Sequence, residues 1–211
     1  MAGDGVELPI FELPMVILPG ELLPLHIFEE RYKRMIGHCL ETAEPFGIVF
    51  RDDEGTAHRI GCTARVTEVL ERFDDGRMNV VVTGEQPFRV LERFDEAEYP
   101  AGEVEPIDRR EESLEEDHDA ADMARQAFAE LVKRVSGDEP PEDLDLEAED
   151  SYGIAARVEL PVETKQALLE QRSEPERMRM LGNALRALVT AVARSGEIAE
   201  RAKMNGKVIV G

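Results

Sequence analysis

The sequence is poor in the residues that build metal centres and disulfide frameworks. It has two cysteines and four histidines in 211 residues, and the histidines are scattered at positions 26, 38, 58 and 118. They form no His-x-x-x-His pair, and Cys39 and Cys62 form no Cys-x-x-Cys pair, so we expect no metal site. Because both cysteines lie within apolar patterns, we expect them to be reduced and buried.

Two signatures of hydrolytic enzymes are also missing. The only Gly-Lys pair, Gly206-Lys207, is followed by Val208, and Arg201 stands where a phosphate-binding loop needs its first glycine. A Gly-x-Ser-x-Gly nucleophile elbow is absent as well. We therefore expect neither an ATPase nor a serine hydrolase, and no cofactor.

Long apolar runs are absent too. The longest, Leu13 to Leu18, is broken by Pro14, and no basic residue precedes the first apolar run as it would in a signal peptide. Hydrophobic residues make up 42% of the chain, which is enough to bury a core. We expect a cytoplasmic protein that does not enter the membrane.

Positive charge is scarce relative to negative charge. The chain carries 46 acidic and 25 basic residues, a net charge of −21, and the acidic excess is concentrated between residues 92 and 150. Such a surface repels phosphate backbones, so nucleic acid is not expected as a partner. The acidic surface favours clients that combine basic and apolar residues, although a solvated face is the simpler interpretation.

The most distinctive segment that is present runs from residue 14 to residue 32. Its prolines, Pro14, Pro19 and Pro24, confine it to short extended pieces, and Pro19-Gly20 suits the centre of a type II turn. A helix follows, with apolar residues at helical spacing. The residues expected on its buried face are Phe28, Tyr32, Met35, Ile36, Cys39 and Leu40.

This segment resembles the opening motif of the Lon substrate-binding domain, the N-terminal domain of the ATP-dependent Lon protease. The matching residues are Pro19, Gly20, Leu23, Pro24, Leu25, Ile27, Phe28, Glu29, Arg31 and Tyr32. Two later blocks agree, residues 84–90 and a block in which Leu160-Pro161 precedes residues 165–170, although the family commonly has a basic residue in place of Pro87. The resemblance covers roughly residues 8 to 193, and it implies a recognition domain without the ATPase and peptidase modules.

The fold class that we expect is α+β. Alternating residues predict strands up to about Pro106, including a hairpin at Asp74-Asp75-Gly76, and helical periodicity follows. The resemblance implies that residues 1–108 form a small PUA-like β domain, an open barrel or sheet, and that residues 109–196 form a helical subdomain. Residues 197–211 form a C-terminal tail.

Four helices are predicted in the second part of the chain. The first carries Met123, Ala127, Phe128, Leu131 and Val135 on one face and stops near Gly137. The second runs from about Ser151 to Val158, and the third follows Pro161. The last begins after Ser173, carries the apolar stripe Met178, Leu181, Leu185, Leu188 and Val192, and closes at Gly196.

By resemblance, the domain recognises unfolded or exposed segments of client proteins, and it could act as an adaptor for an ATP-dependent protease. The candidate peptide-binding residues are Leu22, Leu23, His26 and Phe28, since not all of them can face one core. Packing is the competing interpretation for these residues, and for His26 a hydrogen-bonded structural role is favoured over the role of a general base. Two other functions stay open: a PUA-like module for a small ligand or nucleic acid, and an enzyme with an unrecognised site.

Overall fold

The chain divides into two compact units. The computed structural model describes residues 5–94, 98–107, 117–141 and 144–205, with side chains up to residue 195. Unit 1 comprises residues 1–112 and 155–172, and unit 2 comprises residues 113–154 and 173–211. Residues 155–172 lie within the predicted helical subdomain, residues 109–196, but by their contacts they group with the strands.

Unit 1 is built on a six-stranded mixed sheet with the order β2-β5-β4-β3-β1-β6. Its elements are β1 (Val6–Leu13), β2 (Leu22–Ile27), α1 (Glu30–Thr42), β3 (Phe46–Arg51), β4 (Ala57–Arg72), β5 (Met78–Phe94), β6 (Ala101–Pro106) and α4 (Val162–Glu170). The β1–β3 pair is parallel and the other pairs are antiparallel. Strands followed by helices confirm the expected α+β class.

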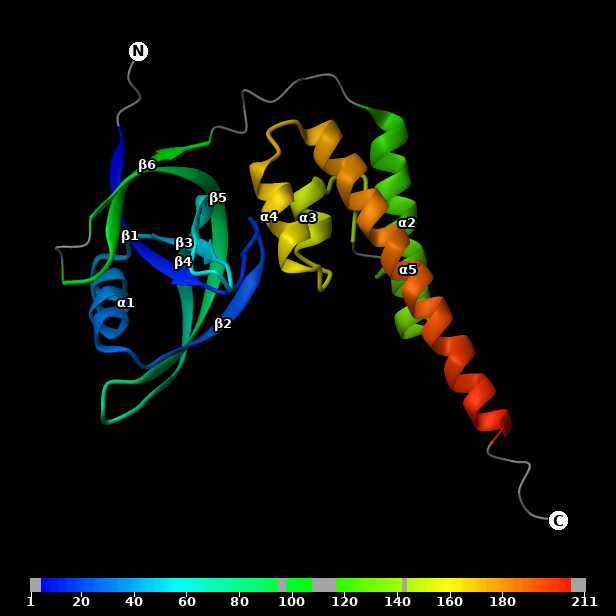
Figure 1. Cartoon of the computed structure of the whole chain (residues 1–211), viewed down its shortest axis with the longest axis horizontal. Coiled ribbons are helices and arrows are strands. Elements are labelled where there is room, and N and C mark those ends of the chain that lie inside the picture. The colour runs from blue at the N-terminus through cyan, green and yellow to red at the C-terminus, as the bar shows by residue number, and fades with distance from the viewer. Residues whose placement is uncertain (1–4, 95–97, 108–116, 142–143, 206–211) are drawn as a thin grey trace. The chain divides into compact units, whose positions relative to one another are not determined.

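Strand β5 closes the sheet on itself. Its first part pairs with β2, and its second part pairs with β6 at the other end of the strand order, so the strands curve around one interior (Figure 1). That interior holds a cluster of fully buried apolar side chains. The cluster comprises Leu8, Ile10, Val49, Phe88, Val90 and Val104.

The helix α1 begins two residues later than the apolar pattern suggests. Glu29 is still extended, with φ −75° and ψ 137°, so the helix starts at Glu30 and Phe28 lies before it. Tyr32, Met35, Ile36 and Cys39 are buried as predicted, whereas Phe28 is 60% exposed. The expectation that Phe28 packs on the helical face is therefore wrong, because the residue still follows the direction of the preceding strand.

The turn at Pro19-Gly20 is confirmed as type II. Gly20 has φ +79°, and the Glu21 N–H donates to the Leu18 carbonyl at 3.0 Å. Two backbone hydrogen bonds join the turn to Gly84 of β5. The Gly20 N–H donates to the Gly84 carbonyl at 2.8 Å, and the Gly84 N–H donates to the Glu21 carbonyl at 3.0 Å. A Cβ atom on Gly84 would lie 2.2 Å from the Leu18 carbonyl oxygen, so only glycine fits there without a shift.

Both cysteines are reduced and buried, as predicted. Burial raises the pKa of the Cys39 thiol to about 11, which keeps it protonated at neutral pH. A protonated, buried thiol is a poor nucleophile, and this agrees with a packing role.

Unit 2 consists of helices α2 (His118–Ser136), α3 (Ser151–Ala155) and α5 (Glu174–Asn205), with α2 packed along α5 (Figure 1). Arg177 is 1% exposed, donates to Ser151 Oγ at 3.1 Å, pairs with Glu174 at 2.5 Å and stacks over Tyr152. A charge this deeply buried is stable only when paired, so these contacts hold α3 to the start of α5.

Several helix boundaries differ from those predicted. Gly137 adopts the left-handed conformation and ends α2 as expected, but Val135 is 69% exposed in the last turn. Helix α3 ends at Ala155, because the Val158 N–H closes a turn to the Ala155 carbonyl instead of continuing the helix.

Helix α5 passes through Gly196 and ends at Asn205, so the prediction that Gly196 closes it is wrong. One glycine costs a helix only about 1 kcal/mol, and the residues that follow it, from Glu197 to Lys203, are mostly good helix formers. Along the apolar stripe, Met178, Leu181 and Leu185 are buried, and Val189 is then buried in preference to Leu188. Residues 206–211 of the predicted C-terminal tail lie outside the described residues.

Replacing Gly84 with alanine should destabilise the protein by about 1–3 kcal/mol, because the new methyl group overlaps the Leu18 backbone. The matched control is Gly37→Ala in α1, where nothing lies within 4 Å of the added Cβ; it should stabilise the protein by about 0.5–1 kcal/mol. Urea unfolding monitored by circular dichroism measures both. Equal stability of the two variants would contradict this packing.

Candidate functional site

Strand β2 exposes a row of apolar residues on one of its two sides. Its residues alternate in burial: Leu25 and Ile27 are buried, whereas Leu22, Pro24 and His26 are exposed. This alternation is the two-residue period of a strand with one face on the core. Leu22 is 64% exposed, so the outward side carries large apolar surface that the unit leaves uncovered.

The four candidate peptide-binding residues lie in or directly after β2, and they fall on two different sides of the strand. Leu22, His26 and Phe28 lie on the outward side, and Leu23 is half-buried on the side of Leu25. The packing interpretation therefore fits Leu23 best and does not account for Leu22 and Phe28. The exposure of these two residues makes the outward side available to a ligand.

An aromatic group extends the outward side beyond β2. The rings of His26 and Phe28 are stacked with their centroids 5.9 Å apart, and Phe73 approaches His26 edge-on at 6.2 Å. The guanidinium of Arg77 lies 5.0 Å from the centre of the Phe73 ring. We call Leu22, Pro24, His26, Phe28 and Phe73 the β2 surface.

Sequence reasoning missed Phe73, which lies 45 positions beyond Phe28 in the chain. It comes directly before the Asp74-Asp75-Gly76 turn, and the hairpin register brings this turn beside the end of β2, with Ile27 opposite Met78. The one available signal was an aromatic residue beside a hairpin turn. The strand order was needed to place it.

His26 is held by a polar chain across three strands. Its Nδ1 lies 2.6 Å from Oδ1 of Asn79 on β5, and Nδ2 of Asn79 donates to Glu71 on β4 at 3.1 Å. Since the asparagine oxygen can only accept, Nδ1 of His26 carries the proton. This hydrogen bond fixes the orientation of the His26 ring on the β2 surface.

Hydrogen bonds to Asp75 shape the hairpin tip beside the β2 surface. Asp75 accepts from the Arg77 backbone N–H at 3.1 Å and from Arg77 Nε at 2.7 Å, and these bonds hold the pKa of Asp75 below its usual value. Asp52 similarly accepts from the Thr56 N–H at 2.7 Å. Asp75 therefore contributes to the predicted turn at Asp74-Asp75-Gly76, and Asp52 contributes to the turn between β3 and β4.

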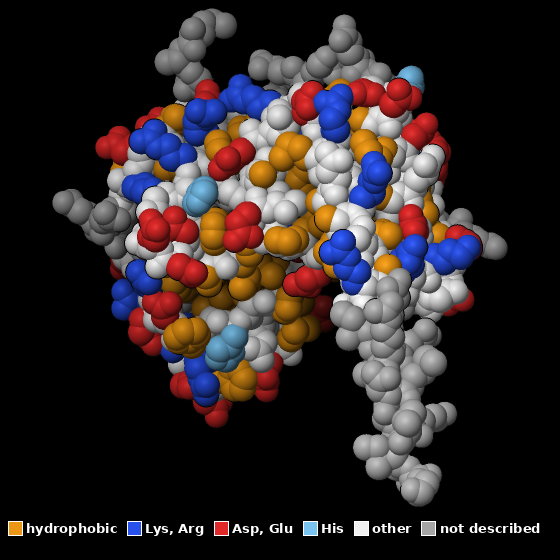
Figure 2. Space-filling model, turned by 45° about the vertical axis from the view of Figure 1, so that its right-hand side comes forward, with side chains coloured by type: hydrophobic (Ala, Val, Ile, Leu, Met, Phe, Trp, Pro, Cys, Tyr) orange, Lys and Arg blue, Asp and Glu red, His pale blue; other side chains and the backbone are white. Residues whose placement is uncertain are grey.

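Strand β2 also lies at the end of the strand order and pairs with β5 alone among the described strands. An end strand has backbone groups on its other side that can pair with an extended peptide. Hydrophobic side chains reach the molecular surface among acidic and basic ones in Figure 2. The combination of a strand edge and apolar side chains is suited to binding polypeptide.

Within the described ranges, no group of three or more His, Cys, Asp or Glu side chains is arranged to hold a metal ion. Over the same part of the chain, no helix is long and apolar enough to cross a membrane.

A comparison with known families decides what kind of domain this is. The model of the ATP-dependent protease La (LON) substrate-binding domain matches residues 7–187. The chain belongs to the Lon substrate-binding domain family. The expected resemblance is thereby confirmed over most of the chain.

Relatives of this Lon-type domain include longer proteins named Lon protease. Lon protease 2 of Myxococcus xanthus is 27% identical in an alignment of 188 residues that covers 82% of this chain and 23% of that protein. The Lon protease of Anaeromyxobacter dehalogenans (strain 2CP-C) is also 27% identical, in an alignment of 188 residues that covers 82% of this chain and 22% of that protein. The chain thus spans less than a quarter of the length of these relatives.

Solved structures share the fold. The N-terminal domain of the Mycobacterium avium complex Lon protease matches with a TM-score of 0.68 and 18% identity, covering 85% of this chain and 98% of that one. A Lon N-terminal domain protein from Xanthomonas campestris matches with a TM-score of 0.58 and 24% identity, covering 83% of this chain and 96% of that one. At these identities the likeness establishes the architecture of the Lon-type domain.

Leu22→Ala should change the free energy of unfolding by no more than about 0.5 kcal/mol, because the side chain is exposed. Leu25→Ala removes the same atoms from the buried side of the same strand and should cost about 2–5 kcal/mol. Urea titration of both variants tests the alternation. A loss at Leu22 as large as that at Leu25 would mean that the outward side is packed.

Proposed function

We propose that this Lon-type domain is a non-catalytic module in the cytoplasm that recognises unfolded or exposed segments of client proteins through the β2 surface. The observation that supports the proposal is the outward side of β2, where Leu22 and Phe28 are more than half exposed beside the sheet edge. Exposed apolar surface of this kind on a folded unit commonly marks a binding site.

The chemistry of the β2 surface fits a polypeptide of varied sequence. The edge of β2 supplies backbone donors and acceptors that any extended segment can pair with, and these bonds do not depend on client sequence. Leu22, Pro24 and Phe28 supply apolar contact, and Phe73 with Arg77 adds an aromatic face and a cation. Folded proteins bury their own apolar side chains, so the surface selects segments that have lost or never had their fold.

The module requires no ATP for this step, and the proposed role is to hold a client for an ATP-dependent protease. Proteases named Lon are among the relatives of this chain, and the match falls within less than a quarter of their length. Binding would precede unfolding and cleavage carried out by other modules. The acidic net charge of −21 favours protein clients over nucleic acid.

Binding of a fluorescently labelled, permanently unfolded protein chain should be saturable by anisotropy, and the native form of the same protein should not bind. Leu22→Asp and Phe28→Asp should each weaken binding about tenfold, since they place a charge on apolar contact surface without entering the core. Thermal melts would check that both variants keep the fold.

The matched control is Leu91→Asp, at an apolar residue of β5 that is 44% exposed and lies away from the β2 pairing. This variant should bind the unfolded chain like the parent protein. Equal binding of native and unfolded chains, or equal loss in all three variants, would count against the proposal.

A further inference from the structure

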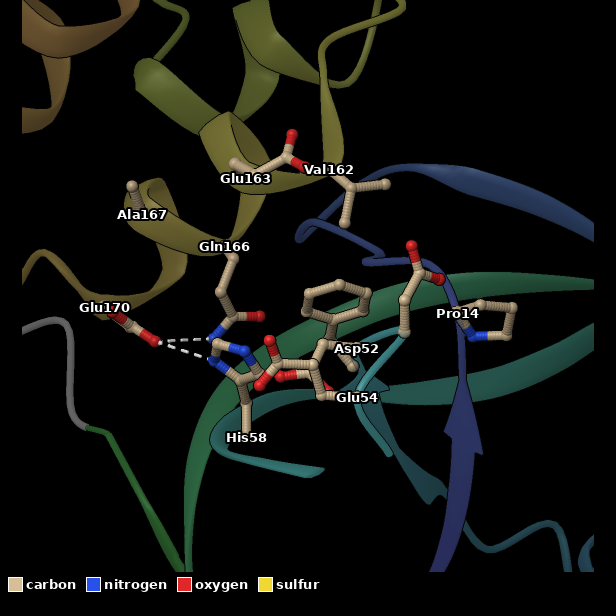
Figure 3. Close-up of a pocket in the computed structure, with 11 residues that line it drawn as sticks. Pro14, Asp52, Glu54, His58, Val162, Glu163, Gln166, Ala167 and Glu170 are labelled. Carbon is tan, nitrogen blue, oxygen red and sulfur yellow. Dashed lines mark hydrogen bonds and ion pairs between the residues drawn. The ribbon is translucent and has the colours of Figure 1, made fainter. Parts of the chain in front are cut away.

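A second candidate site is a pocket within unit 1, which differs from the apolar β2 surface because its lining is acidic. It has a volume of about 570 Å³ and lies between α4 and the β3–β4 turn (Figure 3). The lining residues that matter are the carboxylates Asp52, Asp53, Glu54, Glu163 and Glu170, with His58 and Gln166. Its volume lies in the range of small-ligand sites.

The pocket has a strong excess of negative charge. Five carboxylates line it, and neither lysine nor arginine is among the lining residues. The one basic lining side chain, His58, is already engaged, with Nδ1 3.4 Å from Glu170 Oε1. A cluster of acids alone is no site, but it sets the sign of the charge that the pocket attracts.

Gln166 provides the second, independent observation. Its side chain is 4% exposed, and its Nε2 donates to the Ile60 carbonyl at 3.2 Å and to Glu170 Oε1 at 2.8 Å. Its Oε1 is buried and is the one side-chain oxygen or nitrogen among the described residues found buried without a hydrogen-bond partner. Figure 3 shows this oxygen on the side of Gln166 that faces away from Glu170.

The orientation of the amide cannot be reversed to remove this mismatch. A flip would place the amide oxygen against the Ile60 carbonyl and the Glu170 carboxylate, both of which only accept hydrogen bonds. The nitrogen must therefore face them. The oxygen is left aimed into the pocket as an acceptor in need of a donor.

The pocket also has an apolar wall. Pro14, Phe50, Val162 and Ala167 line it together with the acids. Such a wall suits a short hydrocarbon stem more than a bare ion. A hard divalent cation needs several converging oxygen ligands, and the described residues contain no such group.

We propose that this pocket binds an organic cation, an alkylguanidinium or alkylammonium group, whose N–H donates to Gln166 Oε1 while the carboxylates neutralise its charge. A guanidinium presents several donors in one plane and so satisfies an amide oxygen and a carboxylate together. The apolar wall then covers the stem. Such a group comes either from a free amine or from an arginine or lysine side chain of a protein segment.

The proposal does not depend on the β2 surface, and its test uses small probes. n-Butylguanidinium should bind saturably with a Kd on the order of 1 mM in an NMR titration. Amide signals of residues 50–58 and 162–170 should shift. The neutral isostere n-butylurea should bind at least about tenfold more weakly, because it lacks the charge.

Variants localise the site. Gln166→Met should weaken n-butylguanidinium binding about tenfold, and the double variant Asp53→Asn, Glu54→Gln should weaken it about threefold without touching a buried residue. Glu41→Gln, an exposed acid of α1 outside the pocket, is the control and should bind like the parent.

A capped peptide, acetyl-Gly-Gly-Arg-Gly-Gly-amide, distinguishes the two sources. If the peptide competes with n-butylguanidinium, the pocket is assigned to basic side chains of protein segments. If n-butylguanidinium binds and the peptide does not compete, the pocket is assigned to free amines. Equal binding of n-butylurea, or equal loss in Glu41→Gln, would overturn the proposal, as would no binding at all. Loss of unfolded-chain binding in Leu22→Asp has no bearing on these readouts.

Discussion

The pairing of β2 with β5 is the constraint on which the rest of this structure depends. Because side chains alternate along a strand, the register of this pair decides that Leu25 and Ile27 enter the core and that Leu22 and His26 face outward. The type II turn before β2 fixes that register through its two hydrogen bonds with Gly84. Glu21 stabilises the same turn, since its carboxylate accepts the Leu18 N–H at 2.9 Å and pairs with Lys165 of α4.

The same constraint connects the fold with recognition. A shift by one residue would bury the residues of the β2 surface and expose the core side of the strand, so the proposed binding surface exists only in this register. The turn also links β2 to α4 through Glu21 and Lys165, and α4 carries Gln166 at the acidic pocket. Unit 1 thus supports two surfaces of different chemistry, one apolar and one acidic, on the same framework of strands.

Features set by local chemistry could be predicted from the sequence. Pro19-Gly20 and Asp74-Asp75-Gly76 specify their turns by backbone geometry, and the buried face of α1 follows from its spacing. Features that depend on distant partners could not. Phe73 joins the β2 surface only through strand order, and the unpaired oxygen of Gln166 appears only when Ile60 and Glu170 are beside its nitrogen. The predicted end of α5 at Gly196 is wrong, because one glycine destabilises a helix less than the helix formers that follow it stabilise it.

Site-specific photo-cross-linking would show whether the outward side of β2 contacts unfolded polypeptide. A photoreactive side chain would be placed at position 22, and in separate proteins at positions 25 and 91, and each would be irradiated with a permanently unfolded chain. If β2 contacts the client, position 22 should form cross-links to the unfolded chain that excess unlabelled chain removes, and positions 25 and 91 should form few. Equal cross-linking from position 91, or none from position 22, would contradict this contact.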